Sequence, residues 1–384
     1  MSMATCNQSL TSLTAGPLEF RITETNPETD PRWESFLLEH PDSSIYHHPA
    51  WLKALELEYG QKGVYLLCEN SAGQVSAILP MLYTRGLPFG LGRPLAGRRL
   101  SSLPRTPLGG PLSIDPRATI ALLQAAVQRV TQTPGVMLQL KTEGPKLDGL
   151  IDGVVSAPWR LSYILQLPDA GKDFRISDSH QRSVVRWSVN KAQKLGVEVR
   201  PAESQNDLRS WYTLYLETMR RSIVPPRPYR FFAALWELLK PRGLMQLLVA
   251  EQEINGERRI IAGSIFLTLG KTVSYSFNAS QPKDSSLRPN DVILWQAINI
   301  ACKGGAKFFD FGEVPEGHDD LAKFKRKWGA KPVRLYRYYF PEWPGLKDNS
   351  TDSEGWKDAL GKAVWRRLPI WAISWLGNQI FARL

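Results

Sequence analysis

Residues 308–340 read FFDFGEVPEGHDDLAKFKRKWGAKPVRLYRYYF. Three elements are predicted in this stretch: a strand at 307–311, a short basic helix at 319–328 and a strand at 333–340. Gly312 and Pro315 separate the first strand from the helix. A strand, helix and strand in this order indicate a sheet with helices packed on it.

The predicted helix carries four cations, and one of them differs in position. Three apolar side chains share one face at roughly 100° per residue: Leu321, Phe324 and Trp328. Three cations fall on the opposite side: Lys323, Arg326 and Lys327. Lys325 lies about 40° from Leu321 and is the only cation directed toward the protein body. A lysine held there is suited to neutralise an oxyanion or a phosphate, or else its stem passes along Trp328 to solvent.

Asp310 ends the first strand just before Gly312. A carboxylate in that position lines a site or caps the following loop, and the sequence leaves both open. Alternative proton acceptors follow in the next turn: Glu313, Glu316, Asp319 and Asp320. Five histidines without ligand spacing give no metal site. Phosphate-binding GxxxxGK[ST], HExxH and GxSxG motifs are missing from the sequence.

Upstream, the second half predicts helices at 181–195, 207–220, 229–239 and 290–302, and a strand meander at 245–251, 259–268 and 272–278. The first half shows a less regular version, with strands at 19–24, 64–69, 75–84, 136–140 and 161–167, and helices at 31–40, 49–59 and 116–131. This pattern predicts an α+β (α/β) protein with mixed sheets. We expect two similar units with separate sheets, joined near residues 168–180.

Between the predicted strand at 75–84 and the predicted helix at 116–131 lies a Gly- and Pro-rich stretch at 86–111. Arg85 stands just before it, and it contains Arg93, Arg98, Arg99 and Arg105. It is too long for a simple connection, so we expect a functional or covering loop.

The chain has 384 residues, a length that favours two domains. Its net charge of +11 favours anionic partners.

The three cysteines are widely spaced and form no CxxC pair, which indicates reduced thiols: Cys6, Cys68 and Cys302. The polar N-terminus and the absence of a long apolar run predict a cytoplasmic protein. The tail at 346–384 mixes tryptophan with arginine and lysine, so it either docks as helices or contacts an anionic membrane at the inner face.

Three stretches together resemble the Fem-like transferases: the DFG…FK..WGA run within 308–340, the basic segment HQRSVVRWSVNKAQKLGVEV at 180–199, and the Gly-rich RPLAGRRLSSLPRTPLGGPL at 93–112. HHPAWLKALE at 47–56 also fits. The resemblance spans residues 18–345 and is more specific in the second half. It implies two GNAT-like mixed-sheet domains in tandem with a C-terminal helical tail. The expected divisions are a disordered 1–16, domains at 17–170 and 171–345, and the tail at 346–384.

In the resembled family, the lysine that matches Lys325 is thought to stabilise the transition state of acyl transfer, with Asp310 as a further catalytic candidate. The residues expected to bind the donor or substrate are Arg182, Arg186, Lys283, Arg288 and Phe324. Arg182 and Arg186 are i,i+4 neighbours suited to phosphates, or part of a solvated helix face. We expect both to share a groove with Lys325, which should be partly buried near Asp310 and residues 283–288.

Ordinary GNAT acetyltransferases hold the coenzyme A pyrophosphate on a Q/RxxGxG/A loop after the fourth strand. The corresponding stretch here, SQPKDSSLRPN at 280–290, has no glycine. This departure favours aminoacyl-tRNA, or another donor held by side chains, over acyl-CoA. We expect no tightly bound cofactor.

The resemblance implies transfer of an acyl or aminoacyl group from acyl-CoA or aminoacyl-tRNA to an amine of a cell-envelope precursor, such as a peptidoglycan peptide or an amino sugar. Two alternatives stay open. One is an acyl-CoA-dependent N-acetyltransferase in polysaccharide or lipid synthesis, and the other is a non-catalytic protein that binds nucleic acid or membrane on a GNAT scaffold. The sequence does not give the oligomeric state.

Overall fold

The computed structural model describes residues 20–85, 97–169, 171–254, 256–342 and 359–381. The expectations for residues 1–16 and Arg93, and for the parts of the tail at 346–358 and 382–384, lie outside these ranges. The helices are α1 (Pro31–Glu39), η1 (Ile45–His47), α2 (Pro49–Tyr59), α3 (Pro116–Thr131), α4 (Ser179–Lys194), α5 (Gln205–Ser222), α6 (Tyr229–Leu238), η3 (Lys240–Arg242), η4 (Pro282–Leu287), α7 (Pro289–Lys303), α8 (Asp319–Arg326), α9 (Ala359–Arg367) and α10 (Ile370–Phe381). The strands are β1 (Phe20–Glu24), β2 (Val64–Asn70), β3 (Val75–Thr84), β4 (Arg98–Ser101), β5 (Leu112–Ser113), β6 (Val136–Glu143), β7 (Val155–Gln166), β8 (Glu198–Pro201), β9 (Met245–Ile254), β10 (Glu257–Leu269), β11 (Thr272–Ser280), β12 (Phe308–Val314) and β13 (Lys331–Phe340).

Local sequence signals account for most helix ends. Helix α2 starts at Pro49, which fits the first turn, and the Nδ1 atom of His48 caps it by accepting from the Ala50 amide at 3.1 Å. Gly60, in the left-handed region, ends the same helix. Helix α5 begins with a reciprocal capping box between Ser204 and Asp207. These short-range interactions explain why the sequence predicts the helices with little error.

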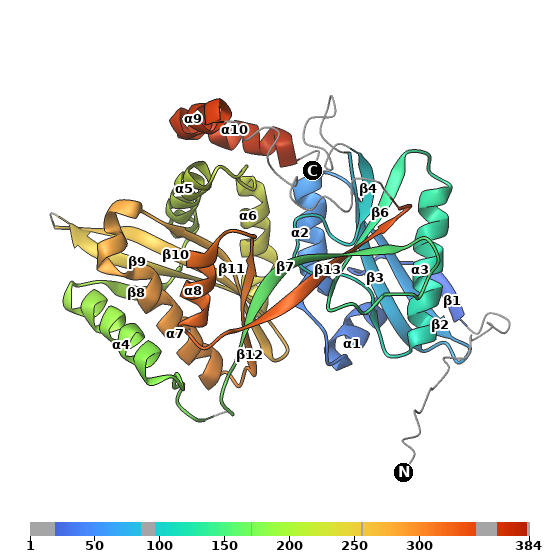
Figure 1. The fold of residues 1–384 in the computed structure, drawn as a ribbon, viewed down its shortest axis with the longest axis horizontal. Coiled ribbons are helices and arrows are strands. Elements are labelled where there is room, and N and C mark those ends of the chain that lie inside the picture. Colours follow the sequence, from blue (N-terminus) through green and yellow to red (C-terminus); the bar gives the residue numbers. More distant parts are fainter. Residues whose placement is uncertain (1–19, 86–96, 170, 255, 343–358, 382–384) are drawn as a thin grey trace, which may run out of the picture.

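Helices cover both faces of each half of the molecule (Figure 1). In the C-terminal half, α4, α7 and α8 lie on one face of the sheet, while α5 and α6 lie on the other (Figure 1). In the N-terminal half, α3 covers one face, and its core is separate from that of α1 and α2. The apolar side chains of α1 and α2 join those of α5 and α6 in a single core cluster. The two halves therefore share a core at their junction.

The strands of the two halves also belong to one sheet. Its order is β1-β2-β3-β4-β6-β13-β7-β12-β11-β10-β9-β8, with β5 paired to β3. The long strands β7 and β13 pair with each other and run from one half into the other, and β13 pairs with β6 of the N-terminal half (Figure 1). The expectation of two separate sheets is wrong, because the last strand returns to the first unit. The expected boundary between residues 170 and 171 stays a prediction.

Candidate active site

Two parallel strands of the C-terminal half separate at the candidate site. Strands β11 and β12 pair only from Thr272 and Phe308 to Ser274 and Asp310. Beyond these pairs β11 continues to Ser280 and β12 to Val314 without further pairing between them. Asp310 therefore occupies the last paired position, at the point where the strands diverge.

A β-bulge fixes the direction of the Asp310 side chain. The register of β12 against β7 shifts between Asp310 and Glu313. Gly312 lies in this bulge with a φ of 75°, a conformation that favours glycine. Its amide donates to Asp310 Oδ1 at 2.8 Å, and the Ser162 hydroxyl donates to the same oxygen at 2.9 Å. The carboxylate is thus buried but held by two donors, and burial raises its pKa above the usual aspartate value.

Lys325 reaches the same bulge from α8. Its side chain is only 4% exposed, and Nζ donates to the carbonyl oxygens of Gly312 at 2.7 Å and Glu313 at 3.1 Å. Burial lowers the pKa of Lys325 to about 8, while the charges of Asp310 and Glu313 oppose this shift. The buried Asp310 carboxylate and the buried Lys325 ammonium therefore both bind backbone groups of the same bulge in β12.

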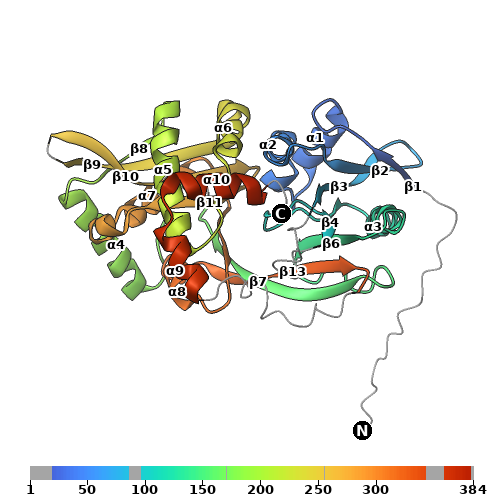
Figure 2. The ribbon, with the colours of Figure 1, turned by 90° about the horizontal axis from the view of Figure 1, so that it is seen from above.

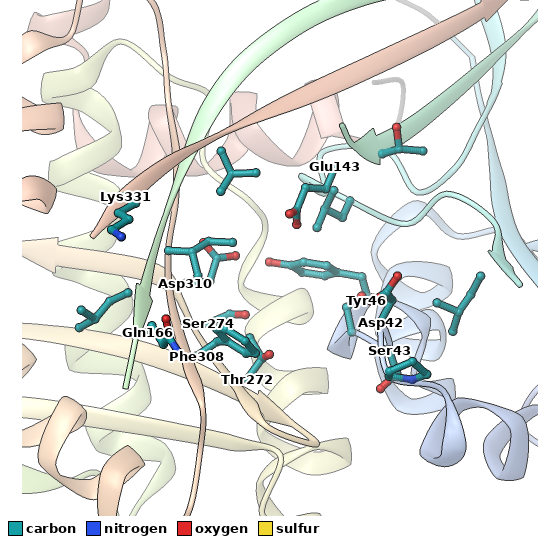
Figure 3. Close-up of a pocket in the computed structure, with 18 of the residues that line it drawn as sticks. Asp42, Ser43, Tyr46, Glu143, Gln166, Thr272, Ser274, Phe308, Asp310 and Lys331 are labelled. Carbon is teal, nitrogen blue, oxygen red and sulfur yellow. The ribbon is translucent and has the colours of Figure 1, made fainter. Parts of the chain in front are cut away.

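A cavity of about 1270 Å³ extends from Asp310 into the space between the two halves (Figure 3). Tyr46 from η1 and Glu143 at the end of β6 line it from the N-terminal half, and both side chains point toward the wall that carries Asp310 (Figure 3). Burial raises the pKa of Glu143, and the charge of Asp310 contributes in the same direction. Sequence reasoning missed Tyr46 and Glu143, because no local motif marks residues that meet across two units.

The structure buries Lys325 as expected, but two details of the expectation are wrong. The lining of this cavity includes Asp310 but not Lys325, because the lysine ammonium turns to the carbonyl oxygens of the bulge. Lys283 and Arg288 do not line it either. Lys325 and Asp310 are therefore neighbours through the bulge rather than in one cleft.

The predicted apolar face is confirmed in part. Trp328 is fully buried and Phe324 packs against the core, but Leu321 is 38% exposed, and Ala322 lies on the buried side with Lys325. Lys325 is not the only cation that contacts the protein, because Arg326 donates to the Tyr163 hydroxyl at 3.1 Å and Lys327 pairs with Asp291. Lys323 does point outward, next to Asp320. Phe324 is half-buried beneath the Lys327 ammonium, 4.4 Å from its ring centre.

The structure does not bring the two arginines of α4 to Lys325. Arg182 is half-buried and donates to the Ile176 carbonyl at 3.0 Å, whereas Arg186 is exposed. Helix α7 lies between α4 and α8 (Figure 1); it contacts α4, and its Asp291 pairs with Lys327, just after the end of α8. The expectation that Arg182 and Arg186 share a groove with Lys325 is therefore wrong, because α7 separates α4 from α8 (Figure 1).

Arg288 instead meets α4 at a tryptophan that the sequence reasoning did not select. Trp187 is 55% exposed, and its ring lies 5.6 Å from the Arg288 guanidinium and 5.2 Å from Lys191 Nζ. Lys283 is exposed on η4, just before Arg288. An exposed indole within the basic run VVRWSVNK was the signal available in the sequence. This surface combines an aromatic face with cations, as nucleobase- and phosphate-binding surfaces do.

Helix α7 follows the stretch at 280–290, which corresponds to the pyrophosphate loop of ordinary GNAT acetyltransferases. Pro289 at the first position has no amide hydrogen to donate, and η4 occupies the preceding stretch in place of a glycine loop. The buried carboxylate of Asp291 lies in the first turn, and the Asp291 amide donates to the Arg288 carbonyl at 3.1 Å. The amides at Pro289 and Asp291 are therefore not free to bind an anion, and the Asp291 carboxylate is paired with Lys327. Among the described residues, no cluster of three or more histidine, cysteine, aspartate or glutamate side chains could hold a metal ion.

Comparison with known proteins agrees with this geometry. Residues 179–326 match the model of the acetyltransferase (GNAT) domain. The crystal structure of FemX superimposes with a TM-score of 0.62 and 15% identity, over 88% of this chain and 100% of FemX. The C-terminal domain of a putative lysylphosphatidylglycerol synthetase from Agrobacterium fabrum gives 0.55 and 12% identity, over 85% of this chain and 96% of that one. L-PGS from Bacillus licheniformis gives 0.53 and 14% identity, over 90% and 99%. No curated protein sequence matches.

The fold is α+β with a mixed sheet, which confirms the expected fold class. The architecture is similar to that of FemX, and residues 179–326 match the model of the acetyltransferase (GNAT) domain.

Proposed function

We propose that this protein transfers an acyl or aminoacyl group from an activated donor to an amine of a bacterial cell-envelope precursor, such as a peptidoglycan peptide or an amino sugar. The observation that carries the proposal is the bulge of β12, which holds the Asp310 carboxylate at the cavity and the Lys325 ammonium beside the strand split. The match of residues 179–326 to GNAT acetyltransferases supports the same reaction class.

The chemistry follows from these two groups. The acceptor amine occupies the cavity, and its nitrogen attacks the carbonyl carbon of the donor. Asp310 takes the proton from the nitrogen, and its raised pKa makes it a stronger proton acceptor than an ordinary aspartate. An ammonium has three N–H donors, of which Lys325 uses two for the bulge carbonyls. The third neutralises the oxyanion of a donor carbonyl that enters where β11 and β12 diverge, beside the bulge and outside the lining of the cavity. The intermediate collapses as the bond to the tRNA oxygen or thiol sulfur breaks, and that atom takes up the proton from Asp310.

Among the two donor classes, aminoacyl-tRNA agrees better with the surface of the C-terminal half. The start of α7 offers no free amide at Pro289 or Asp291 to a pyrophosphate, whereas Trp187, Lys191 and Arg288 offer stacking and charge to a nucleic acid. Arg186 adds an exposed cation on the same helix. The acyl-CoA-dependent N-acetyltransferase is the second candidate, because the GNAT domain match itself favours that donor.

A transfer assay with radiolabelled aminoacyl-tRNA and acyl-CoA, each offered with amine acceptors, tests the proposal. We expect label on the acceptor from aminoacyl-tRNA. Lys325→Ala should reduce the transfer rate by roughly 10²–10³, the loss seen when one oxyanion donor is removed, with a smaller change in donor affinity. Lys323→Ala is the matched control, because that lysine is exposed on the same helix, and it should keep the wild-type rate.

Three outcomes would count against parts of the proposal. If only acyl-CoA supports transfer, acyl-CoA and not aminoacyl-tRNA is the donor. Equal rates for the Lys325→Ala and wild-type proteins would remove Lys325 from the chemistry. No transfer from either donor would favour a non-catalytic binding protein.

A further inference from the structure

The C-terminal tail is fixed to the body of the protein by one of its faces. Helices α9 and α10 lie flat against the C-terminal half as an outer layer over α5 (Figure 2). Trp365 and Ile373 belong to the core shared by the two halves. Arg220 of α5 donates to the Leu368 carbonyl at 3.2 Å, at the turn between the two helices. The tail is therefore docked on the fold, which was one of the two expectations for it; the other was contact with an anionic membrane.

The opposite face of the tail is apolar and exposed. Trp371 is 74% exposed and Trp375 is 56% exposed, and they are i,i+4 neighbours on α10. Val364 of α9 is also exposed. Docking on α5 already buries the other side of these helices, so the outward tryptophans contribute nothing to the core. A cluster of exposed aromatic side chains of this kind marks an interaction surface.

The charges around this face select the type of partner. Arg366 and Arg367 are exposed at the end of α9, next to the turn into α10. Residues 359–381 contain no aspartate or glutamate. Tryptophan at headgroup depth and arginine beside lipid phosphates are the side chains that suit an anionic bilayer surface. No helix in the described part of the chain is long and apolar enough to cross a membrane.

We propose that α9 and α10 form a membrane-binding face that lies in the interface of a bilayer rich in anionic phospholipid. Trp371 and Trp375 enter the headgroup region, and Arg366 and Arg367 bind the lipid phosphates. The rest of the chain stays in water above them. This inference does not depend on the proposed reaction.

Co-sedimentation of the full chain with lipid vesicles tests the inference. We expect binding to phosphatidylcholine vesicles that contain phosphatidylglycerol, weaker binding to phosphatidylcholine alone, and a further loss as salt is added. A Trp371→Ser/Trp375→Ser double variant should bind the anionic vesicles at least tenfold more weakly. An Arg366→Gln/Arg367→Gln double variant should lose the preference for anionic lipid.

The matched control is Trp187→Ser, which removes an exposed tryptophan from another helix and should leave vesicle binding unchanged. Thermal melting checks that every variant is folded, and transfer to a water-soluble acceptor should be the same in the Trp371/Trp375 variant as in the wild type. Equal vesicle binding by that variant and the wild type would overturn the inference. A wild-type chain that fails to sediment with anionic vesicles would overturn it too and would leave the face to a protein partner.

Discussion

The bulge at Gly312 determines which groups of β12 are available for chemistry. It turns the Asp310 carboxylate to the cavity and presents two carbonyl oxygens to Lys325. Lys325 satisfies polar atoms of the backbone and carries a charge, so its removal affects both the fold and the reaction. The two effects are separable, because only the charge depends on pH.

The rate of transfer should fall as pH rises through about 8, the value to which burial lowers the pKa of Lys325. Below that pH the ammonium is charged and neutralises the oxyanion, and above it the charge is lost. Lys325→Arg keeps a charge over the whole range, so we expect a slower enzyme without this alkaline decline. Initial rates at saturating donor, measured between pH 6 and pH 10, provide the comparison. Parallel profiles in the two proteins would assign the decline to another group.

Asp310→Asn should lower the transfer rate by roughly 10²–10⁴, because an amide does not take the proton of the acceptor amine. The asparagine oxygen can still accept from Ser162 and Gly312, so the fold should persist. Transfer kinetics together with thermal melting check both statements. A variant with wild-type rate would move the proton-accepting role to Glu143 or to the substrate.

At the residue scale, the sequence predicts that Lys325 is buried but not that Leu321 is exposed. A helical wheel gives only relative angles, and the eight residues of α8 carry too few apolar side chains to orient it. The sheet decides instead: Ala322 and Lys325 fit against β7 and β12, and Leu321 is left exposed. Tertiary packing thus overrides the apolar pattern.

Among the elements, those with local signals were predicted closely. The sequence predicts α2 at 49–59 and β3 at 75–84, the same bounds as in the structure. The stretch at 86–111 was expected to be a loop throughout, but it contains β4, whose RRLS sequence has no alternating pattern. Strand β7 starts at Val155, whereas the sequence predicts a start at 161. The prediction is too late because Pro158, within the strand, is a residue that disfavours strands. Pairing with distant strands stabilises both.

The loop after β4 packs closely enough to make Gly110 a sensitive position. A β-carbon there would lie 2.5 Å from the Lys141 carbonyl oxygen of β6. We expect Gly110→Ala to lower the free energy of unfolding by about 1–3 kcal/mol, because the loop must move away from the sheet. Urea denaturation measures the change. Gly304→Ala is the control, since its β-carbon would make ordinary contacts at 3.4 Å, and an equal loss in both variants would contradict the explanation.

For the whole molecule, the sequence predicts two similar units but not how they join. The pairing of β13 with β6 links residues nearly two hundred positions apart, for example Tyr338 with Leu140. No local pattern encodes such a pairing, and the alternation of a strand indicates a buried face without naming its neighbour. The candidate cavity has the same origin, because its walls come from both halves.

The shared sheet and core predict that the two halves unfold as one. Trp51 of α2 packs edge-on against Phe231 of α6 at 5.5 Å, and buried Glu58 pairs with Arg227 across the same junction. Circular dichroism and tryptophan fluorescence should therefore report one coincident urea transition.

Glu58→Ala removes this ion-pair partner of the buried Arg227 guanidinium. It should lower the free energy of unfolding by about 3–5 kcal/mol, with an unchanged dependence of that free energy on urea concentration. Lys172→Ala, which breaks an exposed pair with Asp169, should cost less than about 1 kcal/mol. Two separate transitions would instead make residues 170–171 a folding boundary, with β13 added only after each half has formed.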